Sequence, residues 1–190
     1  LVRGSERRSV RRALVHRAEG AWAHLLGRTI DSADGDAPAE LRTAFASANE
    51  GSSLVRGPDG IAELFVETLD PIRSLAIFGA GPDAMAVAEA ATFVGYRVTV
   101  FDHRSELLER WGSLPTVART CVDLGNVRTS LAGFAVDAAV VMTHSLRADA
   151  AFLGALAPIH REAPIPYLGV LGPRARTAPL VAEAGLPDTH

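Results

Sequence analysis

A glycine-rich turn near the middle of the chain has the residue types and spacing of a phosphate-binding loop. Gly79, Gly81 and Ala84 occupy the three small positions of a G-x-G-x-x-[G/A] pattern, with Pro82 and Asp83 between them. Gly79 permits a tight turn, Gly81 lets a phosphate approach the backbone, and Ala84 lets a helix pack closely on a strand. The N-terminus of that helix would offer free N–H groups to an anion, and Pro82 is tolerated in its first turn.

An acid and an arginine follow the next apolar run. Asp102 stands 21 residues after Gly81, a position from which an acid can accept hydrogen bonds from a ribose diol. The alternative interpretation of Asp102 is an N-cap for the next helix. Arg104 could bind the 2′-phosphate of NADP, or it could lie in solvent as a surface arginine. These two residues leave the choice between NAD and NADP open.

Two further turns carry polar residues after apolar runs. Thr143 and His144 follow the fourth expected strand, where His144 could hydrogen-bond a phosphate or a pterin, or transfer a proton near neutral pH. The alternative interpretation of this turn is a helix N-cap, with Thr143 or Ser145 as the capping residue. Gly172 and Arg174 lie in the turn after the fifth expected strand, and Arg174 could bind an anion. The alternative for this turn is a solvated loop.

Strands and helices must alternate after Pro71 if these turns are to act together. Strands are expected at 75–78, 97–101, 117–122, 137–142 and 167–171, and helices at 82–94, 105–111, 146–156 and 176–184. This alternation predicts a Rossmann-type domain over residues 71–190, an α/β fold with a doubly wound parallel sheet. Because ligands bind at the carboxyl ends of such strands, the four turns are expected to meet at one edge of the sheet.

The first part of the chain, residues 1–70, predicts a small α+β domain. Apolar runs at 13–17 and 21–29 flank a turn signal at Glu19-Gly20 and favour a hairpin; a helix is expected over 37–48, and strands over 52–56 and 61–68. The last two strands are separated by Gly57-Pro58-Asp59-Gly60, which is a strong turn signal.

Composition excludes several classes of function. All 19 basic residues are arginine, which excludes a lysine Schiff base and a Walker-type phosphate lysine. The net charge of −3 gives no reason to expect binding to nucleic acid or to an anionic membrane. The single cysteine, Cys121, cannot form an intramolecular disulfide and favours a cytoplasmic setting. The histidines show no metal-ligand spacing, so no protein-bound metal is predicted.

Four ordered segments resemble the Rossmann domain of the XdhC/CoxI accessory proteins. They are GAGPDA at 79–84, VTVFDHR at 98–104, DAAVVMTHS at 137–145 and YLGVLGPR at 167–174. Residues 1–70 resemble the smaller N-terminal domain of that family more loosely. Family members usually carry a glycine-rich segment with a cysteine in that domain, whereas the corresponding residues 25–37 contain no cysteine.

The resemblance implies an accessory protein for molybdenum hydroxylases such as xanthine dehydrogenase and carbon monoxide dehydrogenase. Better-studied members of the family bind molybdenum cofactor (molybdopterin), protect it while its sulfido ligand is installed, and help to insert it into the apo-enzyme. An apo molybdenum hydroxylase is therefore the expected partner. An NAD(P)-dependent oxidoreductase and a non-catalytic NAD(H)-sensing module stay open as alternatives, and so do catalysis by the chain itself and a homodimer.

Overall fold

The computed structural model describes residues 9–31, 35–112, 116–132 and 136–187. The described chain forms two compact units, of which the first ends at Pro71 and the second begins at Ile72. Each unit has its own sheet. Within the described ranges, every helix is too short or too polar to span a membrane.

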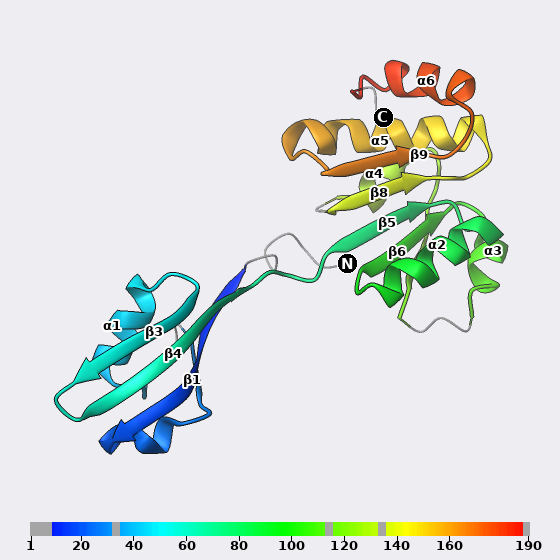
Figure 1. Ribbon diagram of the computed structural model, residues 1–190. Helices are drawn as coiled ribbons and strands as arrows, with labels where there is room; N and C mark the ends of the chain where they lie inside the picture. The colour runs from blue at the N-terminus through cyan, green and yellow to red at the C-terminus, as the bar shows by residue number, and fades with distance from the viewer. Residues whose placement is uncertain (1–8, 32–34, 113–115, 133–135, 188–190) are drawn as a thin grey trace. The chain divides into compact units, whose positions relative to one another are not determined.

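The first unit is an antiparallel sheet with the strand order β2-β1-β4-β3 (Figure 1). Its elements are β1 (Val10–Gly20), the short 3-10 helix η2 (Ala21–Leu25), β2 (Thr29–Asp31), α1 (Ala39–Ser47), β3 (Gly51–Gly57) and β4 (Gly60–Leu69). Alternate strand residues such as Val15 and Leu64 point to one face, where they pack with Trp22 and Leu41. The expected turn joins β3 to β4, with Gly57 opposite Gly60.

The hairpin expected from the first two apolar runs is formed only in part. β1 pairs with β2 in antiparallel register, but β2 contains only Thr29–Asp31. The preceding residues Ala21–Leu25 form η2 instead of a strand, and they bury Trp22 and Leu25 in the core. The apolar character of this run therefore reflects one buried helical face. Residues 32–34, within the stretch that lacks the family cysteine, lie outside the described residues.

The second unit contains a five-stranded parallel sheet with the order β7-β6-β5-β8-β9. Its strands are β5 (Ser74–Phe78), β6 (Arg97–Asp102), β7 (Ala118–Cys121), β8 (Ala138–Val141) and β9 (Tyr167–Val170). All neighbouring strands are parallel. This order confirms the predicted Rossmann-type sheet. The first strand, β5, is central: β6 and β7 are added on one side of it and β8 and β9 on the other, so the strand order reverses between β5 and β8.

Helices cover both faces of this sheet (Figure 1). They are α2 (Pro82–Phe93), α3 (Ser105–Glu109), α4 (Val127–Ser130), α5 (Leu146–Glu162) and α6 (Arg174–Glu183). Leu75 and Ile77 of β5 point to the face of α2 and α3, whereas Ala76 and Phe78 point to the face of α4 and α5. α4 was not expected, because four residues are too few to show a helical period.

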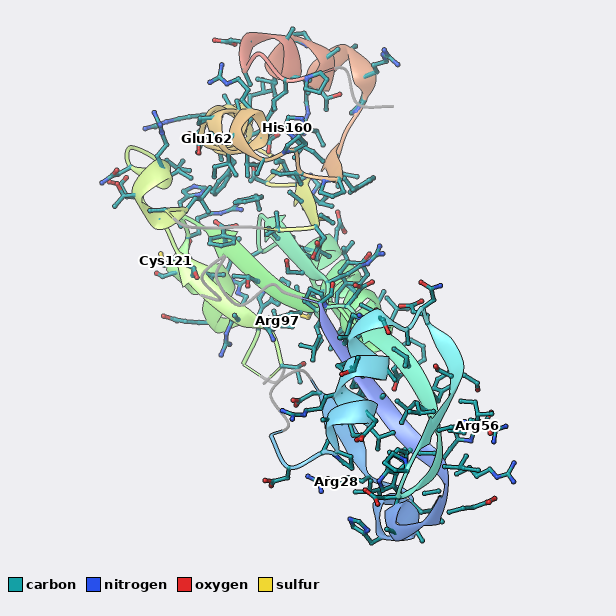
Figure 2. The ribbon with its side chains drawn as sticks, turned by 90° about the vertical axis from the view of Figure 1, so that its left-hand side faces the viewer. Arg28, Arg56, Arg97, Cys121, His160 and Glu162 are labelled. Carbon is teal, nitrogen blue, oxygen red and sulfur yellow. The ribbon has the colours of Figure 1, made fainter. Side chains whose placement is uncertain are left out.

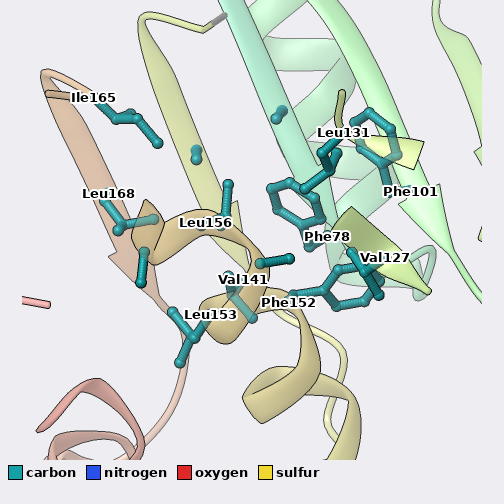
Figure 3. Packing of buried hydrophobic residues seen from close by; sticks show 14 of the residues in the cluster. Phe78, Phe101, Val127, Leu131, Val141, Phe152, Leu153, Leu156, Ile165 and Leu168 are labelled. Carbon is teal, nitrogen blue, oxygen red and sulfur yellow. The ribbon is translucent and has the colours of Figure 1, made fainter. Parts of the chain in front are cut away.

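Stacked aromatic rings fill the core on the α5 side (Figure 3). The ring centroid of Phe78 lies 5.1 Å from that of Phe101 and 4.9 Å from that of Phe152. Phe78 and Phe101 are adjacent strand residues and Phe152 belongs to α5. The carboxyl ends of β5 and β6 are therefore anchored by packing just before the turns that they carry.

Candidate functional site

All the predicted site residues lie at the carboxyl edge of the parallel sheet, in the loops or at the element ends that border them. They are Gly79 and Gly81 after β5, with Pro82, Asp83 and Ala84 at the start of α2; Asp102 at the end of β6 and Arg104 after it; Thr143 and His144 after β8; and Gly172 after β9, with Arg174 at the start of α6. The strand order reverses between β5 and β8, so the loops after these two strands diverge. Doubly wound sheets bind their ligands at such a reversal.

Gly79 is required by the fold itself. Its φ of +122° is a conformation that L side chains rarely adopt, and a Cβ at this position would lie 2.5 Å from the Met142 carbonyl oxygen. Its N–H donates to the Phe101 carbonyl oxygen at 2.8 Å. The glycine turn is therefore pressed against the end of β8 and bonded to the end of β6.

Gly81 is a glycine that the fold does not require. Its φ of −67° and ψ of 171° are available to any residue. Among the described residues, a Cβ at this position would meet one heavy atom within 4 Å, the His144 Cδ2 at 3.9 Å. The space over Gly81, at the first turn of α2, is thus open and lies next to His144. In Rossmann domains that bind dinucleotides, a glycine at this position lets the pyrophosphate approach the backbone.

Two side chains bind the backbone of Ala80, one at its N–H and the other at its carbonyl oxygen. Its N–H donates to Asp102 Oδ2 at 2.7 Å, and its carbonyl oxygen accepts from Trp111 Nε1 at 3.1 Å. Both side chains are buried and come from the second βα unit. The sequence analysis did not identify Trp111, although a buried indole N–H generally needs an acceptor. The glycine turn is therefore fixed in place by residues that follow Ala80 by 22 and 31 positions.

The Asp102 carboxylate is fully buried and already bonded. Its Oδ1 accepts from the N–H of Arg104 at 2.9 Å and from Arg104 Nε at 3.0 Å, and its Oδ2 accepts from Arg104 Nη2 at 2.9 Å. Burial alone raises the pKa of the Asp102 carboxyl, but hydrogen bonds from Arg104 and from the Ala80 N–H outweigh burial and lower that pKa overall. A ribose diol would reach this carboxylate only after Arg104 had moved away.

His103 lies beside the same carboxylate. Its buried Nδ1 is 3.2 Å from Asp102 Oδ1, yet within the described ranges this nitrogen has no hydrogen-bond partner. Its carbonyl oxygen is the acceptor for the thiol of Cys121 at 3.9 Å. Cys121 is exposed at the end of β7 (Figure 2).

An ion pair between the buried Asp149 of α5 and the partly exposed Arg176 of α6 joins the loops after β8 and β9. Asp149 Oδ1 accepts from the N–H of Thr143 at 3.2 Å and from Thr143 Oγ1 at 2.6 Å. Asp149 Oδ2 accepts from Arg176 Nη2 at 3.1 Å, and the same nitrogen donates to the Leu171 carbonyl oxygen at 2.9 Å. Asp149 was not predicted from the sequence. It is an acid in the first turn of a helix, where acids are common for reasons unrelated to a site.

His144 has a strained backbone and pairs across the reversal of the sheet. Its φ of +61° makes it the one non-glycine residue with positive φ in the described part of the chain. The residue before it is bonded to Asp149, and the N–H of Ser145 after it donates to Thr143 Oγ1 at 3.1 Å. Its Nε2 lies 3.2 Å from Asp83 Oδ2. An imidazole held in this way connects the two diverging loops, and such strain is found most often at functional sites.

The turn after β9 is arranged around Arg176. Gly172 has a φ of +136°, and a Cβ there would lie 3.0 Å from Arg176 Nε and Nη2. The missing side chain therefore leaves room for the guanidinium that binds Asp149. Arg174 is exposed at the first position of α6.

These features define a Rossmann-type domain with a phosphate-type turn at the reversal of its sheet. Residues 75–189 match the family described as the XdhC Rossmann domain. This match covers more than half of the chain, and the chain belongs to that family.

Known proteins similar to this chain include one from Bacillus subtilis and one from Bacillus halodurans. It is 30% identical over 129 residues to a probable xanthine dehydrogenase subunit of Bacillus subtilis, and the match covers 65% of this chain and only 36% of that protein. The crystal structure of a xanthine dehydrogenase from Bacillus halodurans has a TM-score of 0.53 and 16% identity, with coverage of 97% of this chain and 84% of that chain. The second likeness concerns the fold alone.

Proposed function

We propose that this chain acts as an XdhC-type accessory protein. In this role it binds a phosphorylated cofactor, molybdenum cofactor in the first place, and assists the maturation of that cofactor or its insertion into a molybdenum hydroxylase. Membership of the XdhC family supports the proposal, and so does the name of the Bacillus subtilis relative, which refers to xanthine dehydrogenase.

The observation that carries the proposal is the open position over Gly81. The fold requires Gly79 but not Gly81, and the space over Gly81 borders His144 and the first turn of α2. The first-turn N–H groups of a helix have no acceptor within that helix, and the helix dipole favours an anion there. A terminal phosphate at Gly81 would therefore meet the backbone N–H groups of Asp83 and Ala84, with the His144 imidazole beside it.

Molybdenum cofactor, when bound, supplies the metal centre that a molybdenum hydroxylase uses. The residues of this chain would only hold and orient the phosphate end of it, through the α2 N-terminus and His144. Asp83 carries a carboxylate at this position, and its contact with His144 Nε2 offsets its repulsion of a phosphate when the imidazole is protonated. Because residues 25–37 contain no cysteine, the proposal is restricted to binding and delivery and does not include sulfuration.

The proposal is tested by adding a side chain over Gly81. Gly81→Val should abolish the thermal stabilisation that molybdopterin gives to the wild-type chain, while the fold is retained. Gly154→Val is a matched control, because Gly154 lies in α5 and its Cβ would also point into open space. The control should keep the response to molybdopterin.

Delivery is tested by reconstitution of an apo molybdenum hydroxylase with molybdopterin, with and without the chain. The recovered activity should be higher with the wild-type chain than with Gly81→Val. Equal recovery in all reactions, together with no thermal shift of the wild-type chain, would overturn the proposal.

A further inference from the structure

We infer that Arg104 is a specificity-determining residue that closes the site to the ribose of a nucleotide. The inference rests on the proposed function in one respect: it takes the turn at Gly81 as the phosphate site. In a Rossmann domain that binds NAD, the acid at the end of the second strand accepts hydrogen bonds from the ribose diol. Asp102 occupies this position at the end of β6. In this chain its carboxylate is taken by Arg104.

The lone pairs of Asp102 are fully used. A carboxylate offers about four lone-pair sites, and Asp102 accepts four hydrogen bonds: three from Arg104, through its N–H, Nε and Nη2, and one from the N–H of Ala80. The side chain of Asp102 has no exposed surface, whereas that of Arg104 is 34% exposed. The Asp102 carboxylate therefore presents no surface to a ligand while Arg104 is bonded to it.

A ribose would have difficulty in displacing Arg104. The guanidinium binds with two N–H groups, and charge-assisted pairs of this kind are stronger than hydrogen bonds from neutral hydroxyls. Arg104 is also only two residues from Asp102, and its backbone N–H binds the same carboxylate. The arginine is therefore held locally even when its side chain moves. The exchange of two charged donors for a neutral diol weakens the total bonding of a buried carboxylate.

The bond between Arg104 and Asp102 indicates which class of ligand the site can take. The site favours a phosphate ester that makes no ribose contact at the end of β6, which describes molybdopterin and does not describe NAD(H). Asp102 is left with a structural role, since its Oδ2 holds the N–H of Ala80 beneath the glycine turn. A rival role for Arg104 is to bind a 2′-phosphate, and the experiment below separates the two roles.

The experiment compares ADP with 2′,3′-dideoxy-ADP, which differs only in the diol. We expect the wild-type chain to bind both with equal affinity, as measured by titration calorimetry. Arg104→Ala and Arg104→Ser should bind ADP at least tenfold more tightly than its dideoxy analogue. Arg104→Ser is included because its hydroxyl can still donate to Asp102, whereas alanine would leave the carboxylate with only the backbone N–H groups of residues 80 and 104. Arg110→Ala is the control, because Arg110 is an exposed arginine at the end of α3. The ratio of ADP to dideoxy-ADP affinity in this variant should equal that of the wild type.

Several results would overturn the inference. One is a tenfold preference of the wild-type chain for the diol, because Asp102 would then be open. Another is a result in which the Arg104 variants, shown by circular dichroism to be folded, have the same ratio of ADP to dideoxy-ADP affinity as the wild type, or bind neither nucleotide. A third is tighter binding of 2′-phospho-ADP than of ADP by the wild type that is lost in Arg104→Ala, which would assign a 2′-phosphate clamp. Failure of molybdopterin to stabilise the wild type would contradict the proposed function but leave these ratios unaffected.

Discussion

Gly79 and Gly81 stand two positions apart, but the surrounding structure constrains them differently. Gly79 has a positive φ and sits against the backbone of β8, whereas Gly81 has an ordinary φ and faces open space. A motif match treats the two glycines alike. Their surroundings show that the fold requires a glycine at position 79 and does not require one at position 81.

This difference predicts opposite effects of the same small substitution. Gly79→Ala should lower the free energy of unfolding by at least about 2 kcal/mol, because it adds a strained φ to a backbone clash. Gly81→Ala should change it by less than about 1 kcal/mol, the scale of an N-cap substitution. Urea denaturation of both variants measures the two effects, and similar losses at both positions would contradict the assignment.

The buried Asp102 carboxylate predicts a dependence of stability on pH. The pKa of Asp102 is lowered in the folded chain, so the carboxylate contributes stability above its unfolded pKa of about 3.9. That contribution is lost as the pH falls below about 4 and through the folded pKa. Arg104 has a raised pKa and stays charged throughout this range.

The comparison that isolates Asp102 uses Asp102→Asn. We expect the wild type to be more stable than Asp102→Asn at pH 7, and the difference in free energy of unfolding to shrink as the pH falls below about 4. Other carboxyl groups titrate in both proteins and cancel in the difference. Denaturation curves at a series of pH values provide the measurement. A difference that stays constant down to about pH 2.5 would show that Asp102 is not held as a carboxylate.

At the scale of elements, Asp149 of α5 connects the loops that follow β8 and β9. It binds Thr143 in the first loop and Arg176 of α6, and Arg176 binds the Leu171 carbonyl oxygen in the second loop. The strained backbone of His144 lies next to Thr143 in this network. Side chains from α5 and α6 therefore help to set the position of His144 at the carboxyl edge of the sheet.

Loss of Asp149 should affect both stability and the site. Asp149→Ala should lower the free energy of unfolding by about 2–3 kcal/mol, because it removes the buried acceptor of the Thr143 N–H and hydroxyl and the partner of the partly exposed Arg176. The NMR signals of the His144 imidazole should also shift, since Thr143 is released. Arg147→Ala removes an exposed charge from the same turn of α5 and should leave both quantities unchanged. A destabilised Asp149→Ala with unchanged His144 signals would mean that Asp149 acts only on stability.

At the scale of the whole molecule, the chain has cores that are separate in sequence. The buried cluster of the first unit contains residues from Ala13 to Val66, and the clusters of the second unit contain residues from Leu75 to Leu186. No residue belongs to clusters of both units among the described residues. Domains with separate cores can fold alone.

The second unit is therefore expected to fold without the first. A fragment of residues 72–190 should give an NMR spectrum whose amide signals overlay those of the same residues in the full chain. A fragment that begins at Gly79 is the control, because it lacks β5, the central strand of the parallel sheet, and it should not fold. An unfolded fragment of residues 72–190 beside a folded full chain would show that the two units depend on each other.

The pattern of residues along the chain was sufficient to predict the parallel sheet. Each strand and helix has its own apolar period, and right-handed crossovers then restrict the order of the strands. The position of Asp102 at the end of β6 was also predicted, because spacing from the glycine turn reports it. The path of Ala21–Leu25 was not, because a short apolar run has the same composition as a strand or as a buried helical face.

Only the tertiary structure decided what each side chain at the edge meets. Asp102 and Arg104 are two positions apart, and this spacing alone would allow either side chain to face a ligand. In the folded chain the two side chains instead bind each other. Trp111 reaches Ala80, and Arg176 reaches Asp149, across 31 and 27 positions. Contacts of this kind depend on how helices pack on the sheet, and no local period records them. The sequence determined which turns lie at the same edge of the sheet. Packing determined that the space over Gly81 is left open and that the Asp102 carboxylate is bonded within the chain.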